Sequence, residues 1–363
     1  MTRVPLRSLG RNGPPVASIG YGTMGLSMAY GSIPSDTERM ALLTRCIELG
    51  STHIDTADVY ADSEVLIGRW LADSSPEMRP KIFLATKFGI VHDQMTGEVC
   101  ARGDKAYVRE RIENSLSRLG VDYIDMVYVH RIDKTVPIEE TVKVMKEFVE
   151  EGKVRHIGLS ECSASTLRRA HAVYPIAACQ VEFSPFALEI EHNGVLEACR
   201  ELGIAVVAYS PLGRGMLTGK YSSRGDFEEA DLRHRMPRFS DENFPKNMVL
   251  VEKIAAMAKR KGCTPGQLTM AWILAQGEDF FVIPGTKRAE LLEENIGAAS
   301  VKLSNEDVAE IRKYAEECTP AGERPWKTHL AFLDSAPPET MAQNKQHGAE
   351  DLEALEELVQ GHH

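Results

Sequence analysis

Short apolar runs alternate with longer amphipathic stretches along most of this chain, and that alternation restricts the possible folds more than any other feature. Continuous apolar runs predict buried strands, and apolar residues three to four positions apart predict helices. The predicted strands are Val16–Thr23, His53–Asp55, Ile82–Lys87, Ile124–His130, Val154–Leu159, Ala177–Val181, Ile204–Tyr209 and Phe280–Ile283. The predicted helices are Asp36–Leu49, Ser63–Leu71, Lys105–Leu119, Ile138–Glu150, Ala164–Val173, Asn193–Leu202, Met248–Lys261 and Ala289–Ala298.

Eight strand–helix units in succession predict parallel strands joined by right-handed crossovers. In a chain of 363 residues, this number of units matches a closed (β/α)8 barrel of the TIM type. A doubly wound sheet is the other α/β architecture to consider. Its dinucleotide site needs a G-x-G-x-x-G turn that opens a helix, and no such turn opens any of the predicted helices. We therefore predict the barrel and no Rossmann site.

Three segments fall outside the alternation. Residues 5–15 contain an Asn-Gly turn and predict a β-hairpin that covers the N-terminal end, or floor, of the barrel. Residues 213–247 form a long connection after the seventh strand, and a loop of this length usually serves function. We expect it to lie over the C-terminal face. Residues 1–320 would form the barrel, and residues 321–363 would form a C-terminal tail that is extended or partly disordered.

The charge and the apolar pattern argue against two classes of partner. The net charge of −11 predicts no nucleic acid and no membrane surface as a partner. No apolar run approaches the ~18 residues that span a bilayer, and the N-terminal residues lack the apolar core of a signal peptide. The seven cysteines form no C-x-x-C pair and predict free thiols in a reducing compartment. We therefore expect a cytoplasmic protein.

Four titratable residues lie at or just after the ends of successive predicted strands. Asp55 ends the second strand, Lys87 the third and His130 the fourth, and Tyr60 lies on the loop after Asp55. Since the carboxyl ends of barrel strands meet around one mouth, we expect these side chains to converge. A cationic Lys87 held by Asp55 would lower the pKa of Tyr60, which would donate a proton, and a neutral His130 would orient a carbonyl group. This set suits carbonyl reduction.

His53 and Asp55 form an H-x-D pair at one strand end, which is also a pattern of metal ligands. A hydrolytic metal site needs three or more ligands, and no second histidine pair stands at another strand end. We therefore expect no metal and a structural role for His53, which precedes the strand end. A metal hydrolase stays open as a third function.

Several ordered motifs carry a resemblance to a known family. They are Gly50-x4-Asp55-Thr-Ala-x2-Tyr60, Ile82-Phe-Leu-Ala-Thr-Lys87, Asp125-Met-Val-Tyr-Val-His130, Gly152-Lys-Val-Arg-x-Ile-Gly-Leu-Ser160, Gln180-Val-Glu-Phe-Ser184, Ala208-Tyr-Ser-Pro-Leu-Gly-Arg-Gly215 and Ile283-Pro-Gly-Thr-Lys-x5-Glu-Glu-Asn295. In these motifs the chain resembles the aldo-keto reductases over roughly residues 5–320. The resemblance implies the same barrel, NADPH (or NADP+) extended across its mouth, and a small-molecule carbonyl substrate.

The resemblance also implies which residues contact each part of the cofactor. Ser160 and Gln180 would hold the nicotinamide carboxamide, and Tyr209 would stack on the nicotinamide ring. The remaining implied contacts are Gly22, Thr23 and Met24 beside cofactor and substrate, Ser210, Leu212, Gly213, Arg214 and Gly215 at the pyrophosphate, Gly285, Thr286, Lys287 and Arg288 at the 2′-phosphate, and Glu294 and Asn295 at the adenine. A helix N-terminus just after Lys287 would favour the anionic group.

Two positions depart from the pattern of the family. Many members have Ser-Asn where this chain has Ser160-Glu161, and a carboxylate cannot donate a hydrogen bond as an amide does. Glu161 would either accept from the carboxamide NH2 or turn away. Many members also have an arginine for the 2′-phosphate where this chain has Leu291, so Lys287 and Arg288 would supply the charge.

The function and the substrate each leave an alternative open. Some relatives in this family are channel-associated β-subunits, so a cofactor-binding regulatory subunit is the alternative to a reductase. Apolar loop residues predict an apolar substrate pocket without identifying the substrate; they are Met28, Tyr30, Phe88, Met95, Met216, Phe239 and Phe244. The sequence shows no dimer seam, so the oligomeric state is open and a monomer is the default expectation.

Overall fold

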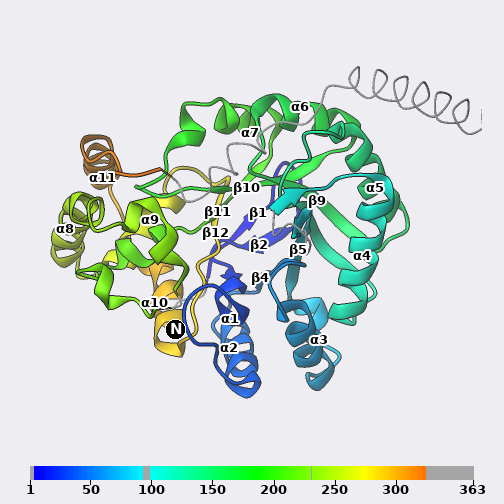
Figure 1. The fold of residues 1–363 in the computed structure, drawn as a ribbon, viewed down its shortest axis with the longest axis horizontal. Coiled ribbons are helices and arrows are strands. Elements are labelled where there is room, and N and C mark those ends of the chain that lie inside the picture. The colour runs from blue at the N-terminus through cyan, green and yellow to red at the C-terminus, as the bar shows by residue number, and fades with distance from the viewer. Residues whose placement is uncertain (1–3, 93–98, 230, 324–363) are drawn as a thin grey trace, which may run out of the picture.

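The computed structural model describes residues 4–92, 99–229 and 231–323. Eight parallel strands form one sheet in the order β12-β11-β10-β9-β8-β5-β4-β3. An isolated parallel bridge between Ile19 and Val282 joins the two edges of this sheet, so the predicted (β/α)8 barrel is confirmed (Figure 1). The strands are β3 (Tyr21–Gly22), β4 (His53–Asp55), β5 (Phe83–Phe88), β8 (Ile124–Val129), β9 (Val154–Ser160), β10 (Ile176–Glu182), β11 (Ala205–Tyr209) and β12 (Phe280–Val282).

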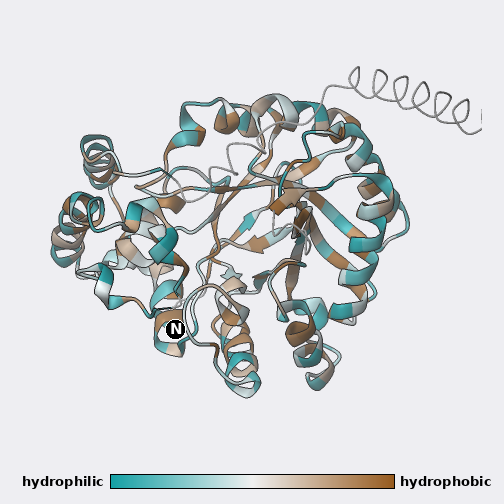
Figure 2. Cartoon of the chain, viewed as in Figure 1, coloured by the Kyte–Doolittle hydropathy of each residue, from teal (hydrophilic) through white to brown (hydrophobic). Residues whose placement is uncertain are grey.

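Helices surround the strands on all sides of the barrel (Figure 1). The helices that follow the barrel strands are α1 (Met24–Ser27), α2 (Asp36–Glu48), α3 (Ser63–Asp73), α4 (Lys105–Leu119), α5 (Ile138–Glu150), α6 (Ala164–Val173), α7 (Val195–Leu202), α8 (Phe244–Lys261), α9 (Pro265–Leu274), α10 (Ala289–Gly297) and α11 (Asn305–Glu317). Figure 2 shows apolar residues concentrated on the strands and on the helix turns that face them. Burial of those apolar stripes holds the helices against the sheet.

Two buried clusters divide the core. The inner cluster fills the barrel and includes Ala85, Met126, Tyr128, Val207 and Phe281, whereas the larger cluster lies between strands and helices. Side chains alternate between the two faces of a strand, so every second residue of a strand points into the barrel. At the carboxyl ends of the strands, beyond the apolar inner cluster, the inward positions are occupied by the polar residues of the mouth.

A hairpin closes the floor of the barrel, as predicted. β1 (Leu6–Ser8) and β2 (Pro15–Ala17) pair antiparallel, and Leu9 and Val16 belong to the inner cluster. The expectation of a single strand over Val16–Thr23 is wrong, because β2 pairs with β1 and only β3 pairs with β4.

A hairpin and two helices are absent from the sequence prediction, and one predicted helix begins earlier than expected. A second hairpin, β6 (Ile90–His92) with β7 (Val99–Ala101), follows β5. Helix α9 is buried on nearly all sides, so it shows no polar stripe from which a period can be recognised. Helix α11 packs on α8, and α8 begins at Phe244 rather than at Met248.

The long connection after β11 consists of short 3-10 turns rather than one open loop. These turns are η3 (Gly213–Thr218), η4 (Arg224–Asp226), η5 (Leu232–Arg235) and η6 (Pro237–Phe239). Asn247 fastens the last described residues to this region, because its side chain donates to the Ala321 carbonyl at 3.0 Å and accepts from the Ala321 N–H at 2.7 Å. Met95 and residues 324–363 lie outside the described residues, so the tail and the boundary at residue 320 stay predictions.

No helix within residues 4–92, 99–229 and 231–323 has the length and apolar content that crossing a bilayer requires.

Gly158 of β9 offers a test of how closely the barrel interior is packed. A Cβ there would lie 2.5 Å from Tyr128 ring carbons and 2.8 Å from the Ala178 carbonyl oxygen. We expect Gly158→Ala to lower the free energy of unfolding by about 1–3 kcal/mol, measured as a lower midpoint of thermal unfolding. Gly225→Ala is the control, because its Cβ would meet nothing closer than 3.5 Å. Equal midpoints for both variants would contradict the packing argument.

Candidate active site

The inward positions at the carboxyl ends of the strands place the predicted residues around one opening. Asp55 ends β4 and is paired in register with Ala85, so Lys87, two residues further along β5, points to the same interior. His130 directly follows β8, and its backbone N–H donates to the Phe88 carbonyl at 2.6 Å. The polar mouth therefore follows from the two-residue period of parallel strands.

The centre of the site is a buried pair of opposite charges. The Lys87 ammonium lies 2.5 Å from Oδ1 of Asp55 and also donates to the Thr56 carbonyl at 2.7 Å. Gln180, from β10, donates through Nε2 to Oδ2 of Asp55 at 2.7 Å. Burial lowers the pKa of Lys87, but the charge of Asp55 and the oxygen of Tyr60 outweigh it, so the pKa is raised overall. Lys87 is therefore a cation at any physiological pH.

Tyr60 and His130 complete the group. The Lys87 ammonium donates to the Tyr60 hydroxyl at 3.3 Å and lies 4.8 Å from the centre of its ring. The rings of Tyr60 and His130 meet edge to face, with centres 5.7 Å apart and an angle of 83° between planes. Tyr60 is half-buried, whereas Asp55 and Lys87 are buried. The structure thus brings together the four residues that the sequence singled out, with the tyrosine hydroxyl nearest to the opening.

The loop that carries Tyr60 has a second support that sequence reasoning missed. The Asp58 backbone N–H donates to the Lys87 carbonyl at 3.0 Å, and the Asp58 carboxylate accepts from Nε of Arg111 at 2.8 Å. Burial raises the pKa of Asp58 to about 6 in spite of Arg111. A carboxylate two residues before Tyr60 was the available signal in the sequence, but the sequence does not show that its partner, Arg111, lies on α4.

The residues expected around the nicotinamide surround the same mouth. Ser160 ends β9, Gln180 lies in β10 and Tyr209 ends β11. Glu161 turns toward Tyr209: its Oε1 accepts from the Tyr209 hydroxyl and from the Glu182 backbone N–H, both at 2.9 Å. Glu182 is a second buried acid that sequence reasoning missed.

The Gly-rich segment after β11 has an unusual backbone. Ser210, Gly213, Arg214 and Gly215 all have positive φ, at 48°, 56°, 56° and 94°, a region that favours glycine. Leu212 accepts from the backbone N–H of Gly215 at 3.0 Å, so this turn is closed on itself. The segment forms a compact loop at the mouth, where the pyrophosphate contacts are expected.

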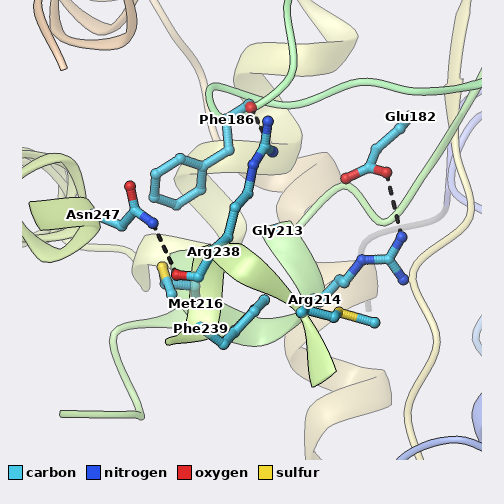
Figure 3. A pocket seen from close by; sticks show the side chains of 9 residues that line it. Glu182, Phe186, Gly213, Arg214, Met216, Arg238, Phe239 and Asn247 are labelled. Carbon is cyan, nitrogen blue, oxygen red and sulfur yellow. Dashed lines mark hydrogen bonds and ion pairs between the residues drawn. The ribbon is translucent and has the colours of Figure 1, made fainter. Parts of the chain in front are cut away.

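Arg214 points into the protein from this loop (Figure 3). Its guanidinium pairs with Glu182 at 3.3 Å and donates to the Tyr30 hydroxyl at 3.4 Å, and these charges raise its pKa although burial opposes them. Its Nε is buried and has no hydrogen-bond partner among the described residues. The adjoining cavity has a volume of about 20 Å³, which is room for about one water molecule. Met216 and Phe239 line this cavity.

Two of the expected cofactor glycines have a packing role. A Cβ on Gly22 would lie 2.8 Å from the Ile283 carbonyl oxygen, and a Cβ on Gly285 would lie 2.8 Å from the Gly22 carbonyl oxygen. Gly22 belongs to a G-x-G-x-x-G run that leads into α1, but the barrel topology makes this a strand contact and no Rossmann turn. Thr23 donates through Oγ1 to the Asp55 carbonyl at 3.0 Å, and Met24 begins α1.

The residues expected at the 2′-phosphate and the adenine lie on and before α10. Lys287 donates to the carbonyls of Tyr30 and Ser32, the latter at 2.6 Å, so its ammonium turns toward the loop before α2. Thr286 accepts from the Arg288 backbone N–H at 3.2 Å, and Arg288 itself is exposed. The two predicted cations therefore have different surroundings: backbone carbonyls hold the Lys287 ammonium, whereas Arg288 faces solvent.

The adenine end has an ion pair that sequence reasoning missed. Glu294 accepts from Lys220 at 3.0 Å and from the Thr264 hydroxyl at 2.9 Å, and Asn295 is buried beside it in the chain. Lys220 comes five residues after the Gly-rich segment, so its position on the same connection could have indicated that it lies near the cofactor contacts. Four of the expected pocket residues belong to the buried core: Phe88, Met216, Phe239 and Phe244.

His53 lies in the barrel interior as a neutral aromatic ring. It is buried, meets Phe83 edge to face at 5.4 Å, and neither ring nitrogen has a hydrogen-bond partner in the part of the chain that the structure describes. Burial lowers its pKa to about 4. Among the described residues, no group of three or more His, Cys, Asp or Glu side chains is placed to hold a metal ion.

Comparison with known proteins gives a consistent result. The model of the aldo/keto reductase family matches residues 18–316. The chain belongs to the aldo-keto reductase family. It is 50% identical to an aldo-keto reductase of Strobilurus tenacellus over 339 residues, covering 92% of this chain and 98% of the relative. It is 48% identical to an aldo-keto reductase of Schizosaccharomyces pombe named with NADP(+), over 341 residues, covering 92% of this chain and 98% of the relative.

Solved structures agree with this membership. A glycerol dehydrogenase of Gluconobacter oxydans superimposes with a TM-score of 0.78 at 26% identity, over 90% of this chain and 99% of that one. A thermostable aldo-keto reductase bound to the inhibitor epalrestat gives 0.68 at 30% identity, over 85% of this chain and 99% of that one. This aldo-keto reductase is therefore an enzyme of the oxidoreductase class.

The buried His53 gives this enzyme a specific dependence of stability on pH. The unfolded ring takes up a proton near pH 6.5 and the native ring only near pH 4, so acid favours unfolding between these values. We expect about 3 kcal/mol of stability to be lost as the pH falls through this window, and His53→Leu to remove most of that loss. Urea unfolding at pH 4.5, 5.5 and 6.5 measures it. His192→Leu, at an exposed position, is the control; a wild-type slope in His53→Leu would contradict the argument.

Proposed function

We propose that this enzyme reduces an aldehyde or ketone to the alcohol with NADPH, reversibly, and that Tyr60 is its proton donor. The observation that carries the proposal is the contact from Asp55 to Lys87 and on to the Tyr60 hydroxyl, at 2.5 and 3.3 Å. Membership of the aldo-keto reductases supports the reaction class, and the relative named with NADP(+) supports the cofactor.

The roles of the four residues follow from charge and position. When Tyr60 gives its proton to a carbonyl oxygen, a phenolate remains, and the Lys87 ammonium beside it stabilises that negative charge. Asp55 keeps Lys87 charged in a buried position. His130, edge-on to the Tyr60 ring, would donate a hydrogen bond to the same carbonyl oxygen and hold it in place. NADPH, when bound, supplies the hydride for the carbonyl carbon.

The residues around the mouth fit a dinucleotide with several phosphates. The buried Nε of Arg214 is a donor without a partner among the described residues, so it is suited to an anionic oxygen. Lys220, Lys287 and Arg288 add positive charge near α10. Gln180 donates one of its two amide hydrogens to Asp55, and its oxygen would accept from the nicotinamide carboxamide, with Ser160 beside it. The Tyr209 ring would form the face on which the nicotinamide stacks.

We extend the proposal to the setting of the enzyme. All seven cysteines are free thiols, which is typical of a reducing compartment and favours the cytoplasm. A monomer with a small-molecule carbonyl substrate accounts for the arrangement of the site without a contribution from a second chain.

Tyr60→Phe tests the proton donor. Phenylalanine keeps the ring but has no proton, so we expect carbonyl reduction to fall by at least about 10²–10⁴-fold while NADPH binding survives. Turnover against a panel of aldehydes and ketones, with a fluorescence titration of NADPH, measures both. Tyr314→Phe on α11 is the matched control and should keep wild-type turnover. Wild-type turnover in Tyr60→Phe would refute the role of Tyr60, and wild-type binding without turnover on any substrate would favour the regulatory alternative.

Lys287→Met tests the proposed 2′-phosphate contact. Because NADH lacks this phosphate, we expect the dissociation constant for NADPH to rise about tenfold while that for NADH changes by less than about twofold. Lys302→Met, at an exposed position outside the proposed contacts, is the control. If the two cofactors weaken equally, Lys287 does not contact the 2′-phosphate, and the same measurement on Arg288→Met then assigns the charge.

A further inference from the structure

Glu161 lies at the nicotinamide end of the mouth, at a position where the family resemblance implies asparagine in many members. It directly follows Ser160 at the end of β9, is 6% exposed and has a positive φ of 50°. Its backbone N–H donates to the Gln180 carbonyl at 3.1 Å. The left-handed backbone and this hydrogen bond together aim its side chain across the strand ends.

The Glu161 carboxylate accepts hydrogen bonds from residues of β10 and β11. Oε1 accepts from the Tyr209 hydroxyl and from the Glu182 backbone N–H, each at 2.9 Å. A tyrosine hydroxyl that donates to a carboxylate makes a strong, directional hydrogen bond. The hydroxyl end of the Tyr209 ring is therefore held by a negative charge that follows β9, with β10 between β9 and β11 in the sheet.

We propose that Glu161 positions Tyr209 and, by its charge, raises the affinity of the site for the oxidised cofactor relative to the reduced one. The inference rests on the proposed function, because it takes Tyr209 as the face on which the nicotinamide stacks. The oxidised and reduced dinucleotides share every phosphate and differ by one positive charge, which the oxidised nicotinamide ring carries. A carboxylate at the rim of that face attracts the oxidised ring and has no such attraction for the neutral reduced ring.

The ion pair of Arg214 with Glu182 does not account for this difference between the two affinities. Arg214 and Glu182 lie 3.3 Å apart and largely cancel each other at a distance. Their charges are also the same in the wild type and in a Glu161 variant. A change in the ratio of the two affinities on substitution of Glu161 therefore reports the charge of Glu161 itself.

The test compares NADP+ and NADPH binding in the wild type and in Glu161→Gln by isothermal titration calorimetry. Glutamine keeps an oxygen that accepts from Tyr209 and removes the charge. We expect the dissociation constant for NADP+ divided by that for NADPH to rise on the order of tenfold. Asp279→Asn is the control for removal of a carboxylate, because Asp279 pairs with Arg200 beside the hairpin end of the barrel, and should leave the ratio unchanged.

Two further variants separate charge from positioning. Glu161→Asp keeps the charge but shortens the side chain, so both dinucleotides should bind more weakly. The dissociation constant for NADP+ divided by that for NADPH should stay within about twofold of the wild-type value. Glu161→Asn removes the charge with a residue that tolerates positive φ, so it replaces Glu161→Gln if that variant does not fold. A merely structural role would weaken both dinucleotides equally in all variants.

The outcomes distinguish this inference from the proposed function. If the wild type binds neither dinucleotide, the proposed function fails and the inference falls with it. If the wild type binds both and the ratio in Glu161→Gln and Glu161→Asn stays within about twofold, or falls, the inference alone is overturned.

Discussion

The buried contact between the Lys87 ammonium and the Asp55 carboxylate is the interaction on which the rest of the mouth depends. A charge at a position 1% exposed, as Lys87 is, is very unfavourable unless it is paired and hydrogen-bonded. Asp55 and the Thr56 carbonyl satisfy the ammonium, and Gln180 satisfies the second carboxylate oxygen. These groups come from β4, β5 and β10, so the pair exists only while those strands stand around one interior.

The barrel can close because glycines, which have no side chain, stand where its first and last strands meet. Gly22 and Gly285 lie so near the opposite backbone that a Cβ on either would approach a carbonyl oxygen to 2.8 Å. The same glycines were expected from the family resemblance to contact the cofactor. Their geometry gives a simpler cause, because any larger residue would push the edges apart at the level of Asp55. Glycine at these two positions therefore serves both the packing of the barrel and the shape of its mouth.

Periodic features of the sequence predict the architecture well and local contacts poorly. Helices α4, α5 and α6 have the predicted ends, since each has an apolar stripe and clear boundaries. Helix α9 escapes prediction because it is apolar all round, and β2 because its pairing with β1 depends on a turn rather than on a period. The four strand-end residues converge because parallel strands leave no other arrangement.

The direction in which a single side chain points cannot be predicted from the sequence. Lys287 donates to the Tyr30 and Ser32 carbonyls, and Glu161 turns to Tyr209, through contacts between segments that are far apart in the chain. No periodicity encodes such a contact, because it depends on loop backbones whose geometry is set by tertiary packing.

Glu182 contacts residues at two parts of the mouth. Its carboxylate pairs with Arg214 on the Gly-rich segment, where phosphates are expected, and its backbone N–H donates to Glu161, beside the expected nicotinamide face. An anion that drew Arg214 away would leave a buried carboxylate with less compensation, which is costly at low dielectric. Glu182 therefore links the segment where the phosphate contacts are expected to the residues expected beside the nicotinamide.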